Sequence, residues 1–313
     1  MTRHAVVIGE ALVDLLESSA DSPAEPAGQL VYHPAIGGAP LNVAVGIARL
    51  GAPSEFAGSV GDDPWAGRIL DFLTAAGVGT RGVVTVPGVA TTLAVTTFRG
   101  IEPTFRFYGD PPSYGLLDAG DVDTDLVGAA GLLYCGSMCL LSPPVLAAAR
   151  TAWATPGPVR VFDPNVRPVV GVDPDVVAEF AATADLVKLS SADAAALWGE
   201  SPTQAAARLL ALGAGAVVVT IGAEGALVAH ADATVRVPAP TVSPVDATGA
   251  GDATMAGLSW GVMTRGLPTD LAGWEALTRV AVHVAGLVCE SRGGAVSMPT
   301  LPALRARFPS LEV

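Results

Sequence analysis

Residues 246–252 read Asp-Ala-Thr-Gly-Ala-Gly-Asp, and a run of small residues follows them. Gly249 and Gly251 have no Cβ, so the backbone here, Ala250 included, can turn sharply and direct its N–H groups at an anion near a helix start. Asp252 follows this turn, and a carboxylate beside an anion makes chemical sense if it takes a proton from an attacking hydroxyl. The stretch therefore predicts phosphoryl transfer to an alcohol. The alternative is a glycine-rich turn before a buried helix, with Asp252 as its N-terminal cap.

Upstream of this stretch, apolar runs of strand length alternate with helical patterns. This alternation is typical of a parallel sheet that is covered by helices on both faces. Three helix starts are marked by a capping residue followed by proline, at 63–64, 142–143 and 201–202. Strands are expected at residues 5–9, 54–59, 132–135, 160–163, 186–189 and 216–221. The sequence therefore predicts an α/β fold, with a doubly wound, mostly parallel sheet flanked by helices.

A second glycine-containing signature lies in the N-terminal part. Residues 37–44 read Gly-Gly-Ala-Pro-Leu-Asn-Val-Ala, and residues 58–63 read Gly-Ser-Val-Gly-Asp-Asp. Together with residues 246–252, these segments resemble the paired signatures of the ribokinase (PfkB) family of carbohydrate kinases, whose usual C-terminal form has two threonines at 247–248. The form Gly-Gly-Ala-Pro is similar to bacterial fructokinases. The resemblance covers nearly the whole chain and implies a ribokinase-like fold.

Two regions, residues 11–37 and 88–109, interrupt the strand-helix alternation. Residues 91–98 and 104–108 are typical of antiparallel strands. We expect one domain over residues 1–313, with these two insertions forming a small β-sheet lid. The lid would otherwise expose aromatic side chains such as Phe107, so it should cover a sugar site, a partner subunit or both. In the family that the chain resembles, the lid closes over the sugar and can form a homodimer.

Short polar side chains suited to sugar hydroxyls lie near the N-terminal signature. Asp14 follows the first expected strand, and Asn42 lies one turn into the helix after Gly37 and Gly38. Both should face the crevice at the carboxyl end of the sheet. The resemblance implies that these positions contact the sugar. Taken singly, Asp14 could equally be a turn residue and Asn42 a helix-start residue.

Residues 162–168, Phe-Asp-Pro-Asn-Val-Arg-Pro, end another expected strand and bring Asn165 and Arg167 to the same crevice. Fructokinase-like and ketodeoxygluconate-kinase-like members of the family share the form Asp-Pro-Asn-x-Arg. The resemblance implies that these side chains bind the substrate and that the arginine faces substrate or phosphate charge. The alternative is a surface ion pair between Arg167 and Asp163.

The segment from Lys188 to Asp193 is the first candidate for nucleotide binding. It corresponds to a family segment in which Asn or Ser is followed three residues later by Glu, near the phosphates and the water shell of Mg²⁺. This chain has Ser190 and the shorter Asp193 there, which leaves the metal role of Asp193 open.

Further nucleotide contacts are expected downstream. Residues 220–225 read Thr-Ile-Gly-Ala-Glu-Gly, and with Thr220 the glycines Gly222 and Gly225 would let the backbone approach the nucleotide, although a plain β-turn has the same composition. His283 lies in a C-terminal helix of small residues and is a candidate for nucleotide contact; a helix-packing histidine is the alternative.

A monovalent-cation site is implied by the resemblance. It would use Asp246 and Thr248, together with Gly294 and Ser297. Asp246 and Thr248 precede the glycine-rich turn at residues 249–251, which we call the anion-binding turn. A bound K⁺ would be held by carboxylate and backbone oxygens and would orient the turn without touching the substrate.

Composition excludes several classes of function. The net charge of −13 argues against nucleic acids and anionic membranes as partners. The high hydrophobicity does not come from one long apolar segment, and there is no signal-peptide pattern, so we expect no membrane span and a cytoplasmic protein. The three cysteines are too few and too scattered for a disulfide framework, and Cys135 and Cys139 should be packed thiols.

The chain is therefore predicted to be an ATP-dependent sugar kinase that uses Mg²⁺ and K⁺ and transfers the γ-phosphoryl group to a primary hydroxyl. Fructose is the first substrate candidate. The alternatives are 2-keto-3-deoxygluconate, whose carboxylate could pair with Arg106 or Arg167, and ribose or a nucleoside. A non-catalytic, sugar-responsive scaffold is the alternative from another class, and the retained Asp252 argues against it.

Overall fold

The computed structural model describes residues 3–17, 31–99, 102–171 and 173–312, with backbone alone at 97–99 and 102–105. Its main feature is a nine-stranded sheet in the order β13-β12-β11-β10-β9-β8-β1-β4-β5. Pairing is parallel from β5 to β11, and β12 and β13 add an antiparallel hairpin at one edge. The strands are β1 (Ala5–Ile8), β4 (Ser54–Val60), β5 (Val78–Thr85), β8 (Leu132–Gly136), β9 (Val159–Asp163), β10 (Leu186–Ser190), β11 (Ala216–Thr220), β12 (Ala226–His230) and β13 (Ala233–Val237).

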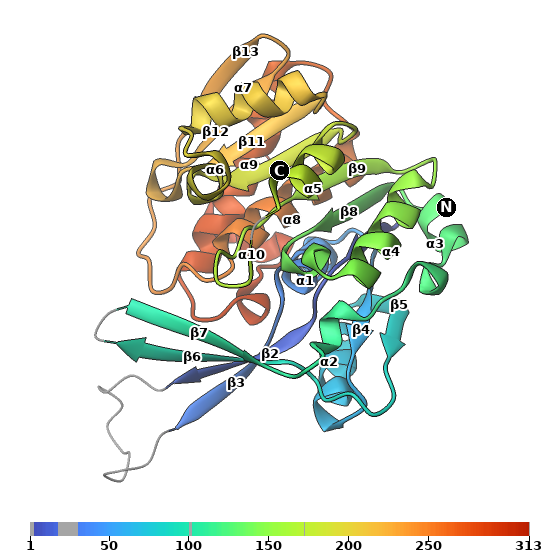
Figure 1. Cartoon of the computed structure of the whole chain (residues 1–313). Coiled ribbons are helices and arrows are strands. Elements are labelled where there is room, and N and C mark those ends of the chain that lie inside the picture. Colours follow the sequence, from blue (N-terminus) through green and yellow to red (C-terminus); the bar gives the residue numbers. More distant parts are fainter. Residues whose placement is uncertain (1–2, 18–30, 100–101, 172, 313) are drawn as a thin grey trace.

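Helices cover both faces of this sheet (Figure 1). The helices are α1 (Ala39–Arg49), α2 (Pro64–Ala75), α3 (Thr124–Gly128), α4 (Pro143–Ala154), α5 (Pro174–Ala181), α6 (Ser191–Trp198), α7 (Pro202–Leu212), α8 (Ala250–Arg265), α9 (Leu271–Cys289) and α10 (Leu301–Arg307). One apolar cluster joins the sheet to α1, α2, α8, α9 and α10, and the other joins it to α3–α7. The central strands are buried on both faces because both carry helices. This confirms the doubly wound, mostly parallel α/β fold.

The expected helix starts are all present, although they are capped differently. Asp63 caps α2 by accepting from two backbone N–H groups, and Ser201 forms a capping box with Gln204 at the start of α7. Ser142 precedes α4 without capping it, and its hydroxyl donates instead to the carbonyl oxygen of Gly115 at 2.6 Å. A capping-type residue before proline thus marks the helix start even where its side chain bonds elsewhere.

A four-stranded sheet of order β3-β2-β6-β7 extends away from the large sheet (Figure 1). Its strands are β2 (Leu12–Glu17), β3 (Tyr32–Gly37), β6 (Leu93–Arg99) and β7 (Glu102–Tyr108). The antiparallel pair expected within residues 88–109 is confirmed as β6 and β7. Residues 18–30 of the first insertion lie outside the described residues. Only residues 9–11 join β1 to β2, so the small sheet continues directly from an interior strand of the large one.

Helix α9 is the one helix in the described part of the chain that is long and apolar enough to cross a membrane. Half of that stretch is buried inside the molecule, and α9 packs against α8. It also carries Glu275 and Arg279, which pair across one helical turn. A core helix meets the same length and composition criterion, so α9 is weak support for a membrane span. Cys135 and Cys139 are buried free thiols, as expected.

Candidate active site

The first turns of α1 and α8 meet at a hydrogen bond between Asn42 and Asp252. The Asn42 side-chain amide donates to Asp252 Oδ2 at 2.8 Å, and both side chains are buried. Burial raises the pKa of Asp252, and the Asn42 hydrogen bond and the charges of Lys188 and Arg167 offset part of this rise. Asp252 is thus a fixed carboxylate with a raised pKa at the start of a helix, which suits a proton acceptor.

The glycine-rich turn before Asp252 is closed by tight backbone packing. Gly249 has φ 81°, and a Cβ there would lie 2.9 Å from the Cα of Gly294, so only glycine fits. The N–H of Ala250 donates to a carbonyl three residues back at 3.1 Å and closes the turn. The N–H groups of Gly251 and Asp252 follow, at the helix start where no intrahelical acceptor exists. These two N–H groups are therefore better placed to receive an anion than that of Ala250.

Asp14 belongs to strand β2 and does not lie in a turn. Its Oδ2 lies 2.1 Å from where a Cβ of Gly37 would be, so the carboxylate crosses directly over that glycine. Gly38 has φ 116°, and a Cβ there would lie 2.3 Å from a main-chain oxygen in the β1–β2 connection. Burial and the charge of Asp252 raise the pKa of Asp14 to about 6, and Arg167 opposes the rise. Asp14, Asp252 and Arg167 thus share one electrostatic environment.

Phe107 lies on β7, opposite Ala94 of β6. Its ring is half-buried and packs against the apolar cluster that includes Leu12 and Ala94. The next residue, Tyr108, is 50% exposed. Phe107 thus helps to join the small sheet to the body, and its contact with a substrate stays a prediction.

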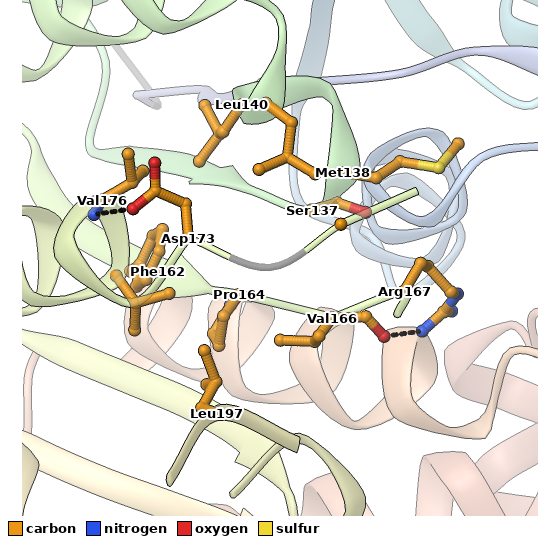
Figure 2. A pocket seen from close by; sticks show the side chains of 13 residues that line it. Ser137, Met138, Leu140, Phe162, Pro164, Val166, Arg167, Asp173, Val176 and Leu197 are labelled. Carbon is orange, nitrogen blue, oxygen red and sulfur yellow. Dashed lines mark hydrogen bonds between the residues drawn. The ribbon is translucent and has the colours of Figure 1, made fainter. Parts of the chain in front are cut away.

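The loop after β9 is held by two carboxylates. Asp163 Oδ1 accepts from the N–H of Asn165 at 3.0 Å, and Asp193 Oδ1 accepts from the N–H of Val166 at 2.9 Å. These bonds hold Asn165 in a left-handed conformation, with φ 38°. Arg167 is exposed, and its guanidinium donates to the carbonyl oxygen of Val166 (Figure 2). A surface pair between Arg167 and Asp163 is not formed, because Asp163 is fully buried and pairs with Lys188.

Lys188 and Asp193 both lie inside the fold. Lys188 Nζ forms a 2.9 Å ion pair with Asp163, and it lies 3.0 Å from where a Cβ of Gly251 would be. Asp193 Oδ2 accepts from both the N–H and the hydroxyl of Ser190, in a capping box that starts α6. Because protein donors already bond both oxygens of Asp193, this carboxylate fits an anchor for the Ser190 and Val166 backbone better than a direct metal ligand.

The turn after β11 has the glycine geometry expected for close backbone approach. Gly222 has φ 54°, and a Cβ there would meet nothing within 4 Å. Gly225 has φ 94°, and its Cβ would lie 2.1 Å from the carbonyl oxygen of Val237, so this glycine serves the packing of the turn. Thr220 ends β11, and its hydroxyl reaches the carbonyl oxygen of Leu189 at 3.4 Å. A nucleotide contact at this turn stays a prediction.

His283 makes the contacts of a helix-packing histidine. Its Nδ1 lies 2.7 Å from the carbonyl oxygen of Arg279, one turn earlier in α9. Its ring meets the edge of Phe308, just after α10, with ring centroids 4.8 Å apart. These contacts use the ring for packing, and a nucleotide contact by His283 stays a prediction.

The residues expected at a monovalent-cation site lie in two adjoining loops. Asp246 accepts from the N–H groups of Thr248 at 2.9 Å and Gly293 at 3.1 Å. Burial raises the pKa of Asp246, but these two hydrogen bonds, the Thr248 hydroxyl and the charge of Arg292 together outweigh burial and keep this pKa below its usual value. Ser297 donates from its backbone N–H to the carbonyl oxygen of Gly294 at 3.1 Å. Backbone donors bond both oxygens of Asp246, as protein donors bond both oxygens of Asp193, so a K⁺ site at these two loops stays a prediction.

A buried polar group at the end of the central strands was missed by the sequence prediction. Glu10 follows β1, and its Oε1 accepts from the hydroxyl of Ser137 at 2.6 Å. Asn165 reaches the same hydroxyl at 3.5 Å. Burial raises the pKa of Glu10. The sequence offered one signal, a charged residue shortly after a fully apolar strand. This pattern predicts no particular role for Glu10 until the neighbouring strands are known.

A pocket with a mostly apolar lining includes Arg167, and its other polar side chains are Ser137 and Asp173 (Figure 2). Met138 and Leu140 form one wall, and Pro164 and Val166 form the opposite wall. Arg167 already donates to a backbone carbonyl oxygen and Asp173 accepts from N–H groups at the start of α5, so few groups are left for the several hydrogen bonds that a sugar needs. The pocket therefore does not fit the sugar site, and the polar groups around Asp14, Asn42 and Asp252 do.

Proteins similar to this chain include several fructokinases. The sequence matches the family described as pfkB family carbohydrate kinase over residues 2–301. A fructokinase of Klebsiella pneumoniae is 33% identical over 305 residues, covering 94% of this chain and 95% of that protein. The structure of fructokinase from Xylella fastidiosa with bound ATP has a TM-score of 0.89 at 25% identity, over 99% of both chains. Fructokinase from Vibrio cholerae O395, in a fructose, ADP and calcium ion bound form, has a TM-score of 0.84 at 29% identity, over 99% of both chains. This chain belongs to the pfkB family of carbohydrate kinases.

Proposed function

We propose that this kinase phosphorylates fructose on a primary hydroxyl, with ATP as the phosphoryl donor. The observation that carries the proposal is the hydrogen bond from Asn42 to Asp252, which fixes a buried carboxylate beside the anion-binding turn. The choice of fructose is supported by the Klebsiella, Xylella and Vibrio relatives, all of which are fructokinases.

In this proposal the sugar lies between Asp14 and Asp252. Asp14, Asn42 and the backbone at Gly37 and Gly38 hold its hydroxyl groups, and the exposed Arg167 faces the transferring phosphoryl group. Asp252 accepts the proton of the attacking hydroxyl. The N–H groups of Gly251 and Asp252 point at the oxygens of the transferring group and stabilise its charge.

The two cations have different support. Among the described residues no group of three acidic, His or Cys side chains could hold a metal ion, so Mg²⁺ would be bound through the ATP phosphates and water. Mg²⁺ would neutralise phosphate charge there. K⁺ would be held by Asp246, Thr248, Gly294 and Ser297, and this site supports the turn at Gly249 through the packing of Gly294 against it.

The small sheet acts as the lid of a single domain in this proposal. Its strand β2 carries Asp14, so movement of the sheet moves a sugar ligand. The half-exposed Tyr108 on β7 supports a homodimer formed through the lid. We place the protein in the cytoplasm, where its ATP and sugar substrates occur.

A second substrate, 2-keto-3-deoxygluconate, is favoured by one observation. The guanidinium of Arg167 is exposed and bonds a backbone carbonyl oxygen, so it can also meet a substrate carboxylate. Arg106 lies near the ring of Tyr108 on the lid, with 5.9 Å from its guanidinium carbon to the ring centroid, and offers a second cation.

The test is ADP release from MgATP with K⁺ present, across fructose, 2-keto-3-deoxygluconate, ribose, glucose and adenosine. We expect turnover with fructose, and an Asp252→Asn variant that loses it by orders of magnitude while sugar affinity is nearly unchanged. Preference for 2-keto-3-deoxygluconate would replace fructose as the substrate. ATP and sugar binding without turnover by the wild-type protein would support the non-catalytic scaffold.

A further inference from the structure

Lys188 is the only lysine in the 313-residue sequence, in which every other basic side chain apart from the histidines is an arginine. It lies on β10 and is 2% exposed, whereas lysine is among the residues least often buried. Its ammonium forms a 2.9 Å ion pair with Asp163, which is itself fully buried. Burying two charges is unfavourable unless they are well paired, so this position has a specific reason to be a lysine.

The ammonium lies directly under the anion-binding turn. A Cβ on Gly251 would be 3.0 Å from Lys188 Nζ, so the ammonium occupies the space beside the second residue of α8 that a larger residue would need. The compact ammonium of a lysine can approach Gly251 this closely. The planar guanidinium of an arginine is larger, so it would not fit the same space in the same way. The anion-binding turn, which receives the phosphoryl group in our proposal, is thus packed against the side chain of the one lysine in the chain.

The same pair connects this turn to the substrate loop. Asp163 Oδ2 holds Lys188, and Asp163 Oδ1 accepts from the N–H of Asn165, two residues before Arg167. Strand β9, strand β10 and the start of α8 are therefore joined through two side chains. The charge of Lys188 also opposes the rise in the pKa of Asp252 that burial causes.

We propose that Lys188 is a positioning residue for phosphoryl transfer: Asp163 fixes its ammonium beneath Gly251, where it holds the anion-binding turn and the Asp252 carboxylate in place. This inference rests on the proposed kinase function. In this role Lys188 supports the transfer step through the turn and the Asp252 carboxylate, and not through sugar binding.

The kinetic test compares Lys188→Met with the wild-type enzyme. We expect kcat to fall about tenfold or more while the KM for the sugar changes less than about threefold, because the interaction supports the transition state and not sugar binding. Arg150→Met, which breaks the exposed pair of Arg150 with Glu179, is the control and should leave both constants unchanged. An unchanged kcat in Lys188→Met would overturn the proposal.

Lys188→Met also leaves Asp163 buried without its partner, so the variant could lose activity through instability alone. The double variant Asp163→Asn with Lys188→Met removes both charges and keeps an oxygen to accept from the N–H of Asn165. We expect its melting temperature to recover toward that of the wild type while kcat stays low. Recovery of kcat together with the melting temperature would show a purely structural pair and overturn the proposal.

A second readout does not depend on turnover. Labelling with ¹³C- and ¹⁵N-lysine gives NMR signals from a single lysine side chain, of which the Cε methylene signal is followed, because the chain has one lysine. We expect this signal to move when Mg²⁺ and the ATP analogue AMP-PNP are added to the wild-type protein. A signal that does not move at saturating analogue would overturn the link between Lys188 and the anion-binding turn. Absence of wild-type turnover with every sugar would instead count against the proposed function.

Discussion

The side-chain amide of Asn42 donates a 2.8 Å hydrogen bond to the carboxylate of Asp252, across 210 positions of sequence. Each residue belongs to one of the two glycine-containing signatures, and each lies in the first turn of a helix, α1 or α8. A Cβ on Gly294 would lie 2.8 Å from the same Asn42 amide nitrogen, so the loop after α9 adjoins this contact as well. Three distant segments of the chain thus meet at one amide group.

Replacing Asn42 by Ala should move the acid limb of the rate profile to higher pH. Burial raises the pKa of Asp252 and the Asn42 hydrogen bond lowers it, so its removal raises that pKa further. A hydrogen bond to a charged group contributes about 1.5–3 kcal/mol, which corresponds to about one to two pH units. The measurement is kcat/KM against pH. Gln204→Ala, at the exposed start of α7, should keep the wild-type profile; an unmoved limb in Asn42→Ala would show that Asp252 does not limit the rate at low pH.

Two Gly-to-Ala variants should have opposite effects. Gly249→Ala places a methyl group 2.9 Å from the Cα of Gly294 at φ 81°, so it should abolish turnover and lower the melting temperature. Gly67→Ala lies on helix α2, where the new methyl group meets nothing within 4 Å, and it should stabilise the protein by about 0.5–1 kcal/mol with normal turnover. Thermal unfolding and ADP release measure both. Normal turnover in Gly249→Ala would disprove the role of the turn.

Arg49→Met should loosen the loop at residues 294–298. The Arg49 guanidinium donates to the carbonyl oxygens of Val296 and Met298, each at 2.9 Å, and more weakly to Ala295. We expect a loss of about 1.5–3 kcal/mol in unfolding free energy. A higher K⁺ concentration should also be needed for half-maximal rate, because Gly294 packs against the turn. Arg68→Met, on the exposed face of α2, should do neither. The idea fails if the K⁺ dependence of Arg49→Met equals that of the wild type.

Asp14→Asn should stabilise the unliganded protein at pH 8 but not at pH 4. The folded-state pKa of Asp14 is about 6, above its ordinary value of 3.8. The carboxyl group therefore favours folding below about pH 4, and this contribution is lost as the pH rises through 6. The gain at pH 8 should be about 2 kcal/mol, reduced by partial solvent exposure. Chemical unfolding at the two pH values measures it, and sugar KM should rise in the same variant. An equal difference at both pH values would contradict the assignment.

The sequence predicted β1, β4, β8, β9, β10 and β11 and the lid pair β6 and β7, but it missed β5, β12 and β13. Strands β12 and β13 form a hairpin whose turn at residues 231–232 reads Ala-Asp, without the glycine or asparagine that marks such turns, and Ala231 takes φ 50°. Strand β5 contains Gly79 and Gly82, which weaken a strand pattern. The structure explains both glycines, because β5 pairs with β4. A Cβ on Gly79 would clash with Glu55, and a Cβ on Gly82 would clash with Ala57.

The site was predictable where one local motif carried it, as at residues 37–42 and 249–252. The pair of Lys188 with Asp163 and the bond of Glu10 with Ser137 were not predicted, because each joins residues from two neighbouring strands or the loops that follow them. Those contacts depend on the strand order β10-β9-β8-β1, which no local pattern contains.

The residues that we assign to the sugar lie mostly before residue 110, and those that we assign to the phosphates lie mostly after residue 186. The loop at residues 163–167 lies between them, and the two sets touch at Asn42 and Asp252. Substitutions in the N-terminal part could therefore change the preferred sugar without changing the residues that act on the phosphoryl group. A chimera that takes its first 110 residues from a relative would exchange the sugar and keep the transfer machinery, provided that an asparagine still meets Asp252.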